Sequence, residues 1–474
     1  LREEPPRLLP VERRNKVLAD LAGIEDQSVS RRKEKLTWGV HMPDDDDHVI
    51  WVWFDALINY VSGLLKEEVE RRADQPDPLP FDELIQAETF QRFWPHTVHL
   101  LGKDILWHHT LIWWSMLLGV GLAPPKLVFA HGWWTVEGMK ISKALGTGID
   151  PSIVSARFGV DPLRYYMLRE MTFGSDGDFA VGHLVQRINT DLGKGGLGNL
   201  VARTLNLVEK QREGRVPAIR ESAWSQQDQA LRDAVEASSL AFQHHLEHFQ
   251  PHLAIEDLNR IVRVASQYID EQAPWKLGKA DPSDQAAQSR LDNSLACLCE
   301  VCRILSVLLE PVMPDTARKI CRKLGQPEAP PDPLAMAEVP LQDRVRWGGT
   351  LANVTIEKGE NLFPSVDSAL AMQVEFGDNQ VATIRLEGFL ETATAEELRS
   401  CLRDAAAGVE PKRDGKSQPS KKHRKPTALV VECGELVYCS ATGAKAFAEA
   451  RELFPTVELR NVPPTLADVI TPAT

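Results

Sequence analysis

The sequence predicts a multidomain protein in which an α/β unit is followed by a helical bundle and then by a small α/β domain. Its 474 residues are about three times the ~150 residues expected of one domain. The spacing of apolar residues changes near residue 176 and again near residue 370. With 43% hydrophobic and 26% charged residues, the composition is globular and excludes a wholly disordered chain.

The first predicted domain, residues 1–175, alternates buried strands with helices. The apolar block at 49–65 starts as a buried strand, Val49–Phe54, and continues as a helix. Residues 96–122 predict a strand, a glycine turn and a long apolar helix, and residues 125–134 predict another buried strand. Strand, helix and strand at this spacing indicate a parallel α/β unit.

The later segments predict two further domains. Residues 176–345 carry apolar side chains at three- and four-residue spacing, which is typical of a helical bundle. Residues 346–369 are expected to form a return segment and linker. Residues 370–474 alternate strand-like stretches such as VATIRLEG and ALVVECGELVY with helical ones such as TAEELRSCLRDAA. This pattern predicts a small α/β domain.

Charge and cysteine content narrow the class of protein. No run of 18 apolar residues occurs, so we expect no membrane span, and seven cysteines in a long chain indicate the reduced thiols of a cytoplasmic protein. The net charge is −13, so a nucleic-acid partner would need a local basic surface. The basic run 412–425 is most simply a solvated loop, with a nucleic-acid contact as the alternative.

One loop-like segment, GMKISKALGTGIDP at 138–151, suits phosphate chemistry. Lys140 and Lys143 flank Ser142 between glycines, directly after a predicted strand. Ammonium groups placed in this way can stabilise the charge that develops on a phosphate during its transfer. An exposed lysine- and glycine-rich loop with no such role is the alternative.

A second segment, LLGKDILWHH at 100–109, suits a nucleotide. Gly102 at a strand end would let a ligand approach the backbone, and Asp104 could accept hydrogen bonds from ribose hydroxyls. His109 lies about one helical turn beyond Ile105, so the two could share a face. The alternative for His109 is a histidine satisfied within the core.

A third segment, WVWFDALINY at 51–60, suits a linear apolar ligand. Trp53, Ala56 and Tyr60 share one face if the segment is helical. Aromatic rings around a small residue favour a thioether, because sulfur–aromatic contacts are favourable. Plain core packing is the alternative.

Together these segments resemble the methionyl-tRNA synthetases, which are class I aminoacyl-tRNA synthetases. VWFDALINY, GKDILWHH, PKLVFAHGWWTVEGMKISKALG and LFP occur in the order of that family, and SVSRRKEKLTWG at 28–39 resembles another of its stretches. GLGNLVARTLN and YIDEQAPWKLGK resemble its anticodon-binding bundle. The resemblance runs from about Val11 to Asp367. It implies a Rossmann-type catalytic half-domain at 1–175, an α-helical anticodon-binding bundle at 176–345, and ligation of methionine to tRNA(Met) using ATP with Mg²⁺.

The resemblance also implies three groups of site residues. The ATP-binding residues are Gly102, Asp104, Lys140, Ser142 and Lys143, with Lys140 and Lys143 as the catalytic pair. The residues that line the methionine site are Trp53, Ala56, Leu57, Tyr60, Ile105 and His109. The residues that contact the anticodon are Asn199, Arg203 and Trp275. From the residue pattern alone, the favoured interpretation of Asn199 is a surface polar residue of a helix, and that of Trp275 is a half-buried packing residue.

The chain also departs from the family pattern. Ile141 and Ala144 replace the Met and final Ser of the family's Lys-Met-Ser-Lys-Ser loop, and the family's His-x-Gly-His motif does not occur. Because the chain begins with Leu1, we expect it to lack the N-terminal part of the family fold, including its zinc knuckle, so no zinc is expected. An inactive fragment that binds the tRNA anticodon and docks a partner is the alternative function.

Two side-chain clusters are expected to be structural. Cys297, Cys299 and Cys302 lie close together on a predicted helix without a matching Cys/His pair, which indicates core thiols rather than a metal site. Four histidines lie at helical spacing without a glutamate at the position that a zinc protease motif requires. We expect them to form a surface cluster; they are His244, His245, His248 and His252.

The last predicted domain resembles a different family. Residues of about 370–472 resemble the STAS domain of anti-sigma factor antagonists and sulfate transporters. In that family a phosphorylatable serine lies in a turn at a helix N-terminus, where free N–H groups suit a phosphate. Here the turn is Ser440-Ala441-Thr442-Gly443, with Ala441 at the usual acceptor position. We therefore expect a structural or partner-docking role, and a regulatory protein led by this domain is a third hypothesis.

Overall fold

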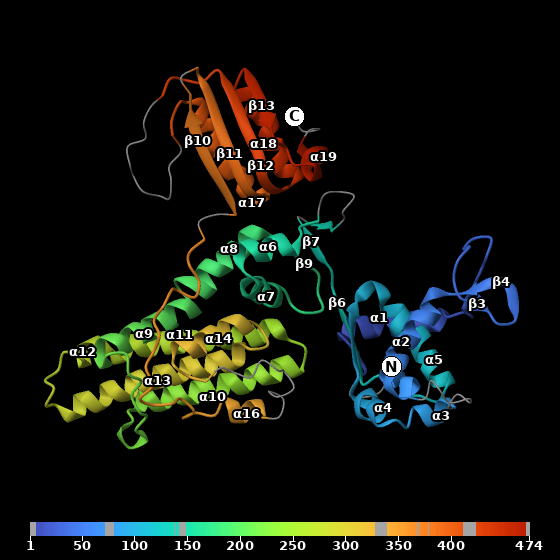
Figure 1. Cartoon of the computed structure of the whole chain (residues 1–474), viewed down its shortest axis with the longest axis horizontal. Coiled ribbons are helices and arrows are strands. Elements are labelled where there is room, and N and C mark those ends of the chain that lie inside the picture. Colours follow the sequence, from blue (N-terminus) through green and yellow to red (C-terminus); the bar gives the residue numbers. More distant parts are fainter. Residues whose placement is uncertain are drawn as a thin grey trace. The chain divides into compact units, whose positions relative to one another are not determined.

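The computed structural model describes residues 6–71, 80–136, 138–141, 148–327, 339–366, 369–377, 379–410 and 423–470. The chain divides into two compact units, Leu1–Trp133 with Gly174–Asp176, and Trp134–Phe173 with Gly177–Thr474. The order of elements confirms the prediction of α/β elements, then a run of helices, then a second α/β region (Figure 1).

The first unit is built on a parallel sheet of three strands. Their order is β1-β6-β5, with β1 at Leu8–Leu9, β6 at Leu127–His131 and β5 at Val98–Gly102. The chain passes from β5 to β6 through a 3₁₀ turn, a π-helical turn and a helix, which confirms the predicted strand–helix–strand unit. These connecting elements are Lys103–Ile105, His108–Ile112 and α5 (Trp113–Gly119).

The predicted strand at Val49–Phe54 is wrong beyond Ile50. Strand β4 (Asp45–Ile50) belongs instead to a small antiparallel sheet, and helix α2 already begins at Val52. The cause is the buried face of α2, on which Leu57, Val61 and Leu65 recur every four residues. The same helical repeat includes residues 52–54 of the tryptophan-rich start of the block, where packing of the helix outweighs the local preference for a strand.

The remaining elements of the first unit surround these two sheets. Strands β2 and β3 flank β4, and the helices pack around the parallel sheet. Their bounds are β2 (Ser30–Arg32), β3 (His41–Met42), α1 (Val11–Asp20), α2 (Val52–Arg71), α3 (Phe81–Leu84) and α4 (Glu88–Phe93).

The second unit begins with a small three-stranded sheet followed by short helices. The strands run in the order β8-β7-β9, with β8 antiparallel and β9 parallel to β7. These elements are β7 (Trp134–Val136), β8 (Met139–Lys140), α6 (Pro151–Phe158), α7 (Val160–Arg169), β9 (Gly177–Asp178), α8 (Val181–Arg187) and a π-helical turn at Ile188–Gly193.

The predicted bundle follows as long helices with a shared apolar core. Cys297, Cys299 and Cys302 are completely buried within it, which confirms that they are core thiols, and burial raises the pKa of each. The helices are α9 (Leu197–Arg212), α10 (Gln226–Glu247), α11 (Pro251–Gln272), α12 (Pro274–Leu277), α13 (Gln285–Leu309), α14 (Pro314–Lys323) and α16 (Leu341–Arg344).

The C-terminal region is a four-stranded mixed sheet with helices. The order is β10-β11-β12-β13, in which only the β10–β11 pair is antiparallel. Alternate residues of β11 and β12 pack with α17 and α18 in one core, as the predicted α/β pattern requires. The elements are β10 (Leu370–Phe376), β11 (Val381–Leu390), α17 (Thr392–Ala406), β12 (Ala428–Cys439), α18 (Ala441–Leu453), β13 (Thr456–Arg460) and α19 (Ala467–Ile470).

Candidate functional site

An aromatic cluster in the first unit brings together residues predicted for the methionine site. Tyr60 on α2 and His109 on the π-helical turn are joined by a hydrogen bond of 2.9 Å between Oη and Nε2. The ring of Trp53 lies edge-on to His109 at 5.9 Å between centroids. A π-helical turn holds one extra residue, and such turns recur at functional sites. The predicted helix therefore carries Trp53 and Tyr60 beside His109, and their place in a methionine site stays a prediction.

The hydrogen bonds of His109 favour one tautomer. Its Nδ1 lies 3.0 Å from the carbonyl oxygen of Ile105, which can only accept a hydrogen bond. Nδ1 therefore carries the proton, and Nε2 accepts from the Tyr60 hydroxyl. Burial lowers the pKa of His109 and raises that of Tyr60, so both are neutral near pH 7. Burial, together with the neighbouring His109, also lowers the pKa of His99 to about 4.

The other predicted methionine-site residues lie on different sides of the same elements. Ala56 is exposed and shares the face of Trp53 and Tyr60, whereas Leu57 is 1% exposed and belongs to the core. Ile105 packs partly buried against that core. The residues of this uncharged aromatic cluster suit an apolar side chain that contains sulfur.

A polar group lies at the end of β5 in the same unit. Trp133 donates from Nε1 to Asp104 at 3.2 Å and from its backbone N–H to Asp176 at 2.8 Å. Lys103 bonds to both oxygens of Asp176, at 2.7 and 2.6 Å, and lies over the Trp133 ring. The Lys103 ammonium and the Trp133 N–H lower the pKa of Asp176. Asp104 is exposed here, where it could meet ribose hydroxyls.

Glycines make this group compact. A Cβ at Gly102 would lie 2.6 Å from an oxygen of Asp104, and a Cβ at Gly132 would lie 2.1 Å from the carbonyl oxygen of Ser175. The Gly132 approach requires glycine because it is made to backbone, whereas a side chain at Gly102 would displace the Asp104 carboxylate. Sequence reasoning predicted Gly102 and Asp104 but missed Trp133 and Asp176. The available signal was the acidic, glycine-containing stretch GSDGD at 174–178, which spans the predicted end of the first domain at residue 175.

Lys140 lies on β8, exposed, at the end of a hairpin that Asp178 fixes. One oxygen of Asp178 accepts from the Thr135 hydroxyl at 2.6 Å and from the Gly138 N–H at 2.9 Å. In the hairpin, Lys140 pairs with Thr135. The predicted site residues Ser142 and Lys143 lie outside the described residues. Lys140 belongs to the second unit and Asp104 to the first, so a site that contains both stays a prediction.

The three predicted anticodon residues lie on α9 and α12, two helices in contact. Asn199 and Arg203 are four residues apart on α9 and partly exposed, and Arg203 bonds to Asp270 at 2.6 Å. Trp275 on α12 is 39% exposed. Ala273, at φ 44°, turns the chain between α11 and α12. The exposed Trp275 ring suits stacking on an unpaired base.

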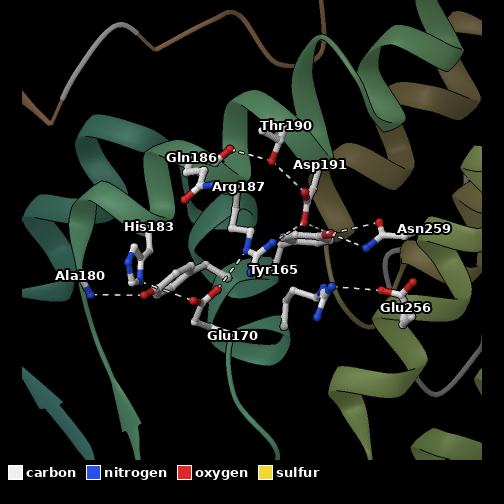
Figure 2. Close-up of polar contacts among 12 residues, drawn as sticks. Tyr165, Glu170, Ala180, His183, Gln186, Arg187, Thr190, Asp191, Glu256 and Asn259 are labelled. Atoms are coloured by element: carbon white, nitrogen blue, oxygen red, sulfur yellow. Dashed lines mark hydrogen bonds and ion pairs between the residues drawn. The ribbon is translucent and has the colours of Figure 1, made fainter. Parts of the chain in front are cut away.

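A polar network missed by sequence reasoning joins α7, the π-helical turn after α8, and α11 (Figure 2). The hydroxyl of Tyr165 lies 3.1 Å from Asp191 and accepts from the amide of Asn259 at 3.0 Å. Burial, followed by the charge of Asp191, raises the pKa of Tyr165, which therefore stays a donor. Nearby, Arg187 bonds to Glu170 at 3.0 Å. The residues of this network are up to 94 positions apart in the sequence, so no local spacing could predict the network.

The other predicted clusters have structural partners. His245 pairs with Asp257 at 2.7 Å, and His244 and His248 are exposed. Within the described ranges, no group of three or more His, Cys, Asp or Glu side chains is arranged to hold a metal ion. Ser440 is 2% exposed and caps α18 by accepting from the Gly443 N–H at 3.0 Å. No helix in the described part of the chain has the length and apolarity needed to cross a membrane.

Comparisons with known proteins give a class I synthetase region followed by an anticodon-binding domain, which is the order that the sequence resemblance implied. Residues 5–205 match the family of tRNA synthetases class I (M), and residues 216–342 match the anticodon binding domain of methionyl tRNA ligase. The methionine–tRNA ligase of Bacillus subtilis is 35% identical over 368 residues, which are 77% of this chain and 51% of that protein. That of Rickettsia bellii is 37% identical over 324 residues, 68% of this chain and 58% of that protein.

Solved structures give the same result. Mycobacterium tuberculosis methionyl-tRNA synthetase in complex with methionyl-adenylate aligns with a TM-score of 0.64 and 35% identity, over 76% of this chain and 64% of that one. The chain spans about half the length of the curated relatives it matches. Over residues 5–342, where a class I synthetase region is followed by the family's anticodon-binding domain, the chain belongs to the methionyl-tRNA synthetases.

Proposed function

We propose that the protein activates methionine with ATP and transfers it to tRNA(Met). The observation that carries this proposal is the neutral cluster of Trp53, Tyr60 and His109, because it offers a thioether side chain aromatic contacts without a charge. A solved relative at 35% identity is described as a complex with methionyl-adenylate. The proposal extends that ligand chemistry to this chain.

The reaction has two steps. The carboxylate of methionine attacks the α-phosphate of ATP, which gives methionyl-adenylate and pyrophosphate. The terminal ribose hydroxyl of tRNA then takes the methionyl group and AMP leaves. No covalent protein nucleophile is required, so positioning and charge stabilisation supply the catalysis.

The predicted ATP-binding residues act in the first step. Asp104 and Gly102 hold the ribose of ATP, and Lys140 and Lys143 stabilise the phosphate charge of the first transition state. Ser142 adds a hydroxyl donor to the phosphates. ATP would carry Mg²⁺, whose charge would offset that of the phosphate oxygens.

The proposed activity is tested by methionine-dependent exchange of labelled pyrophosphate into ATP, beside gel-shift with initiator and elongator tRNA. Exchange that requires methionine supports the ligase. A gel shift with tRNA(Met) but no exchange from this chain favours the alternative, an anticodon-binding and partner-docking fragment. The absence of both pyrophosphate exchange and a gel shift would contradict both functions.

Trp275 should contribute to tRNA binding through stacking. Replacing Trp275 with alanine should weaken binding of tRNA(Met) by about 1–3 kcal/mol, the cost of losing one stacked base. Trp275→Phe keeps an aromatic face and should retain most of the affinity. Filter binding at fixed salt measures both variants. Equal affinities for wild type and Trp275→Ala would remove Trp275 from the interface.

The finer assignments belong to the same proposal. We propose that the protein works in the cytoplasm, which its seven free cysteines support. We propose a STAS-like identity and a partner-docking role for residues 370–474, supported by the sheet with α17 and α18. The burial of Ser440 argues against a phosphate switch there, and absence of labelling at Ser440 and Thr442 is the expected result.

A further inference from the structure

One buried carboxylate caps two helices that are distant in sequence. Glu391, 4% exposed, is the N-cap residue of α17, and its side chain accepts from a backbone N–H of that helix. It also accepts from the N–H of Val181, at 2.7 Å, in the first turn of α8, 210 residues away. The N-cap of α8 is Ala180, whose methyl group cannot accept a hydrogen bond. Glu391 therefore supplies the cap that α8 lacks.

An apolar core surrounds this carboxylate. Phe389 and Tyr438 of the C-terminal domain are buried in one cluster with Val154 of α6, Tyr166 of α7 and Leu184 of α8. The two helix starts also approach closely, since a Cβ built on Gly182 would lie 3.6 Å from that of Ala393. Arg157 and Glu387 add an ion pair of 3.5 Å. The C-terminal domain is thus packed onto α6, α7 and α8.

The capped end of α8 is directly connected to the hairpin that carries Lys140. Asp178, which holds the Gly138 N–H and the Thr135 hydroxyl, lies three residues before Val181. The intervening Ala180 N–H bonds to the hydroxyl of Tyr166 at 3.2 Å. Val136 of β7 and Phe179 belong to the same buried cluster as Phe389. Displacement of the start of α8 would therefore move the anchor of the hairpin.

We propose that the C-terminal domain positions the Lys140 hairpin, and that Glu391 is the positioning residue. The carboxylate holds the start of α8, α8 holds Asp178, and Asp178 fixes the turn at Gly138. The importance of this hairpin for ATP rests on the proposed function. The mechanical link is independent of it, so the two can fail separately.

Amide hydrogen exchange of the full chain tests the link. In Glu391→Ala, exchange at Val181 and Gly138 should rise on the order of tenfold, since Val181 loses its acceptor and the displaced start of α8 loosens the Asp178 anchor of Gly138. Tryptic cleavage after Lys140 should accelerate with it. Glu391→Gln should restore most of the protection, because its carbonyl oxygen can still accept from Val181.

Thr394→Ala is the matched control. The hydroxyl of Thr394 bonds to the backbone of Glu391 and Phe389, so it supports the start of α17 without bonding to α8. This variant should leave exchange at Val181 and Gly138 at the wild-type level. If it raises exchange as much as Glu391→Ala does, general loosening of the C-terminal domain explains the effect and the proposal fails.

Gly182→Leu approaches the link from the other side. The larger side chain should push against Ala393 while leaving the capping of α17 intact, so it should raise exchange at Gly138 even if Glu391→Ala unfolds the C-terminal domain. Wild-type exchange at Gly138 in Gly182→Leu, with β11 amides still protected, overturns the proposal. In a form of the protein that catalyses methionine-dependent pyrophosphate exchange, Glu391→Ala should lower kcat and leave the KM for methionine unchanged. If the variants raise amide exchange but no form of the protein catalyses the reaction, the mechanical link is supported and only the proposed function is rejected.

Discussion

Replacing Lys143 with alanine should lower methionine-dependent pyrophosphate exchange by roughly 30- to 1000-fold, equivalent to about 2–4 kcal/mol in the adenylation transition state. The reason is that negative charge develops on the α-phosphate and the leaving pyrophosphate, where an ammonium group stabilises it. The KM for methionine should change little, because methionine is held by the aromatic cluster. The measurement uses whichever form of the protein, this chain or a longer one, supports the exchange.

Lys126→Ala is the control for this substitution. Lys126 is exposed just before β6, at the opposite end of that strand from His131 and the polar group of Asp104. Removing its charge should leave exchange within about twofold of wild type, as expected of a solvated surface lysine. Unchanged exchange in Lys143→Ala would contradict the assigned role of the lysine pair.

Substitution of Glu300 should destabilise the second unit by about 3–5 kcal/mol. Glu300 on α13 has no exposed surface, yet its carboxylate accepts from the backbone N–H groups of Gly348, Gly349 and Thr350 and from Arg303. In Glu300→Ala these partly buried hydrogen bonds lose their buried acceptor, and Arg303 loses its counter-charge. The free energy of unfolding from urea titration measures the loss.

Acid should reduce the difference between wild type and Glu300→Gln. Burial acts to raise the pKa of Glu300, but hydrogen bonds from Arg303, Thr350 and Gly349 outweigh it and hold the pKa below 4.5. The contribution of the charge is therefore full above pH 4.5 and is lost as the pH falls through the folded-state pKa. A constant difference down to the acid transition would contradict this origin.

Asp233→Asn is the matched control for Glu300. Asp233 also pairs with an arginine on the bundle, Arg232 at 2.8 Å, but its side chain is 62% exposed. Solvent screening limits such a pair to about 0–1 kcal/mol. A loss equal to that of Glu300 variants would mean that burial is not the cause.

The spacing of apolar residues along the sequence predicts most of the helices and strands. The bundle helices follow from apolar residues at three- and four-residue spacing, and β5 and β6 follow from short apolar runs around a glycine turn. The start of α2 did not, because Trp51 to Phe54 favour a strand locally while the buried face of Leu57 and Val61 requires a helix. The choice between strand and helix at this position depends on packing against the core, which the local sequence does not show.

The site divides in the same way. Spacing predicted the shared helical face of Trp53 and Tyr60, and the family resemblance added His109, whereas Asp176, Asp178 and Glu391 act through partners 40 to 210 residues away. A carboxylate that caps a distant helix has no local signature. Only the family resemblance suggested anticodon roles for Asn199 and Trp275, which the residue pattern alone predicted to be a surface position and a half-buried packing position.

Transfer of labelled methionine to tRNA(Met) tests the central claim most directly. With ATP and Mg²⁺ present, the account predicts acid-precipitable methionyl-tRNA that requires ATP and is lost in Lys143→Ala. Leucine or isoleucine should not replace methionine, since the uncharged aromatic cluster of Tyr60 and His109 is suited to a thioether. Formation of equal product with those amino acids, or tRNA that binds but is never charged in any form of the protein, would contradict the claim.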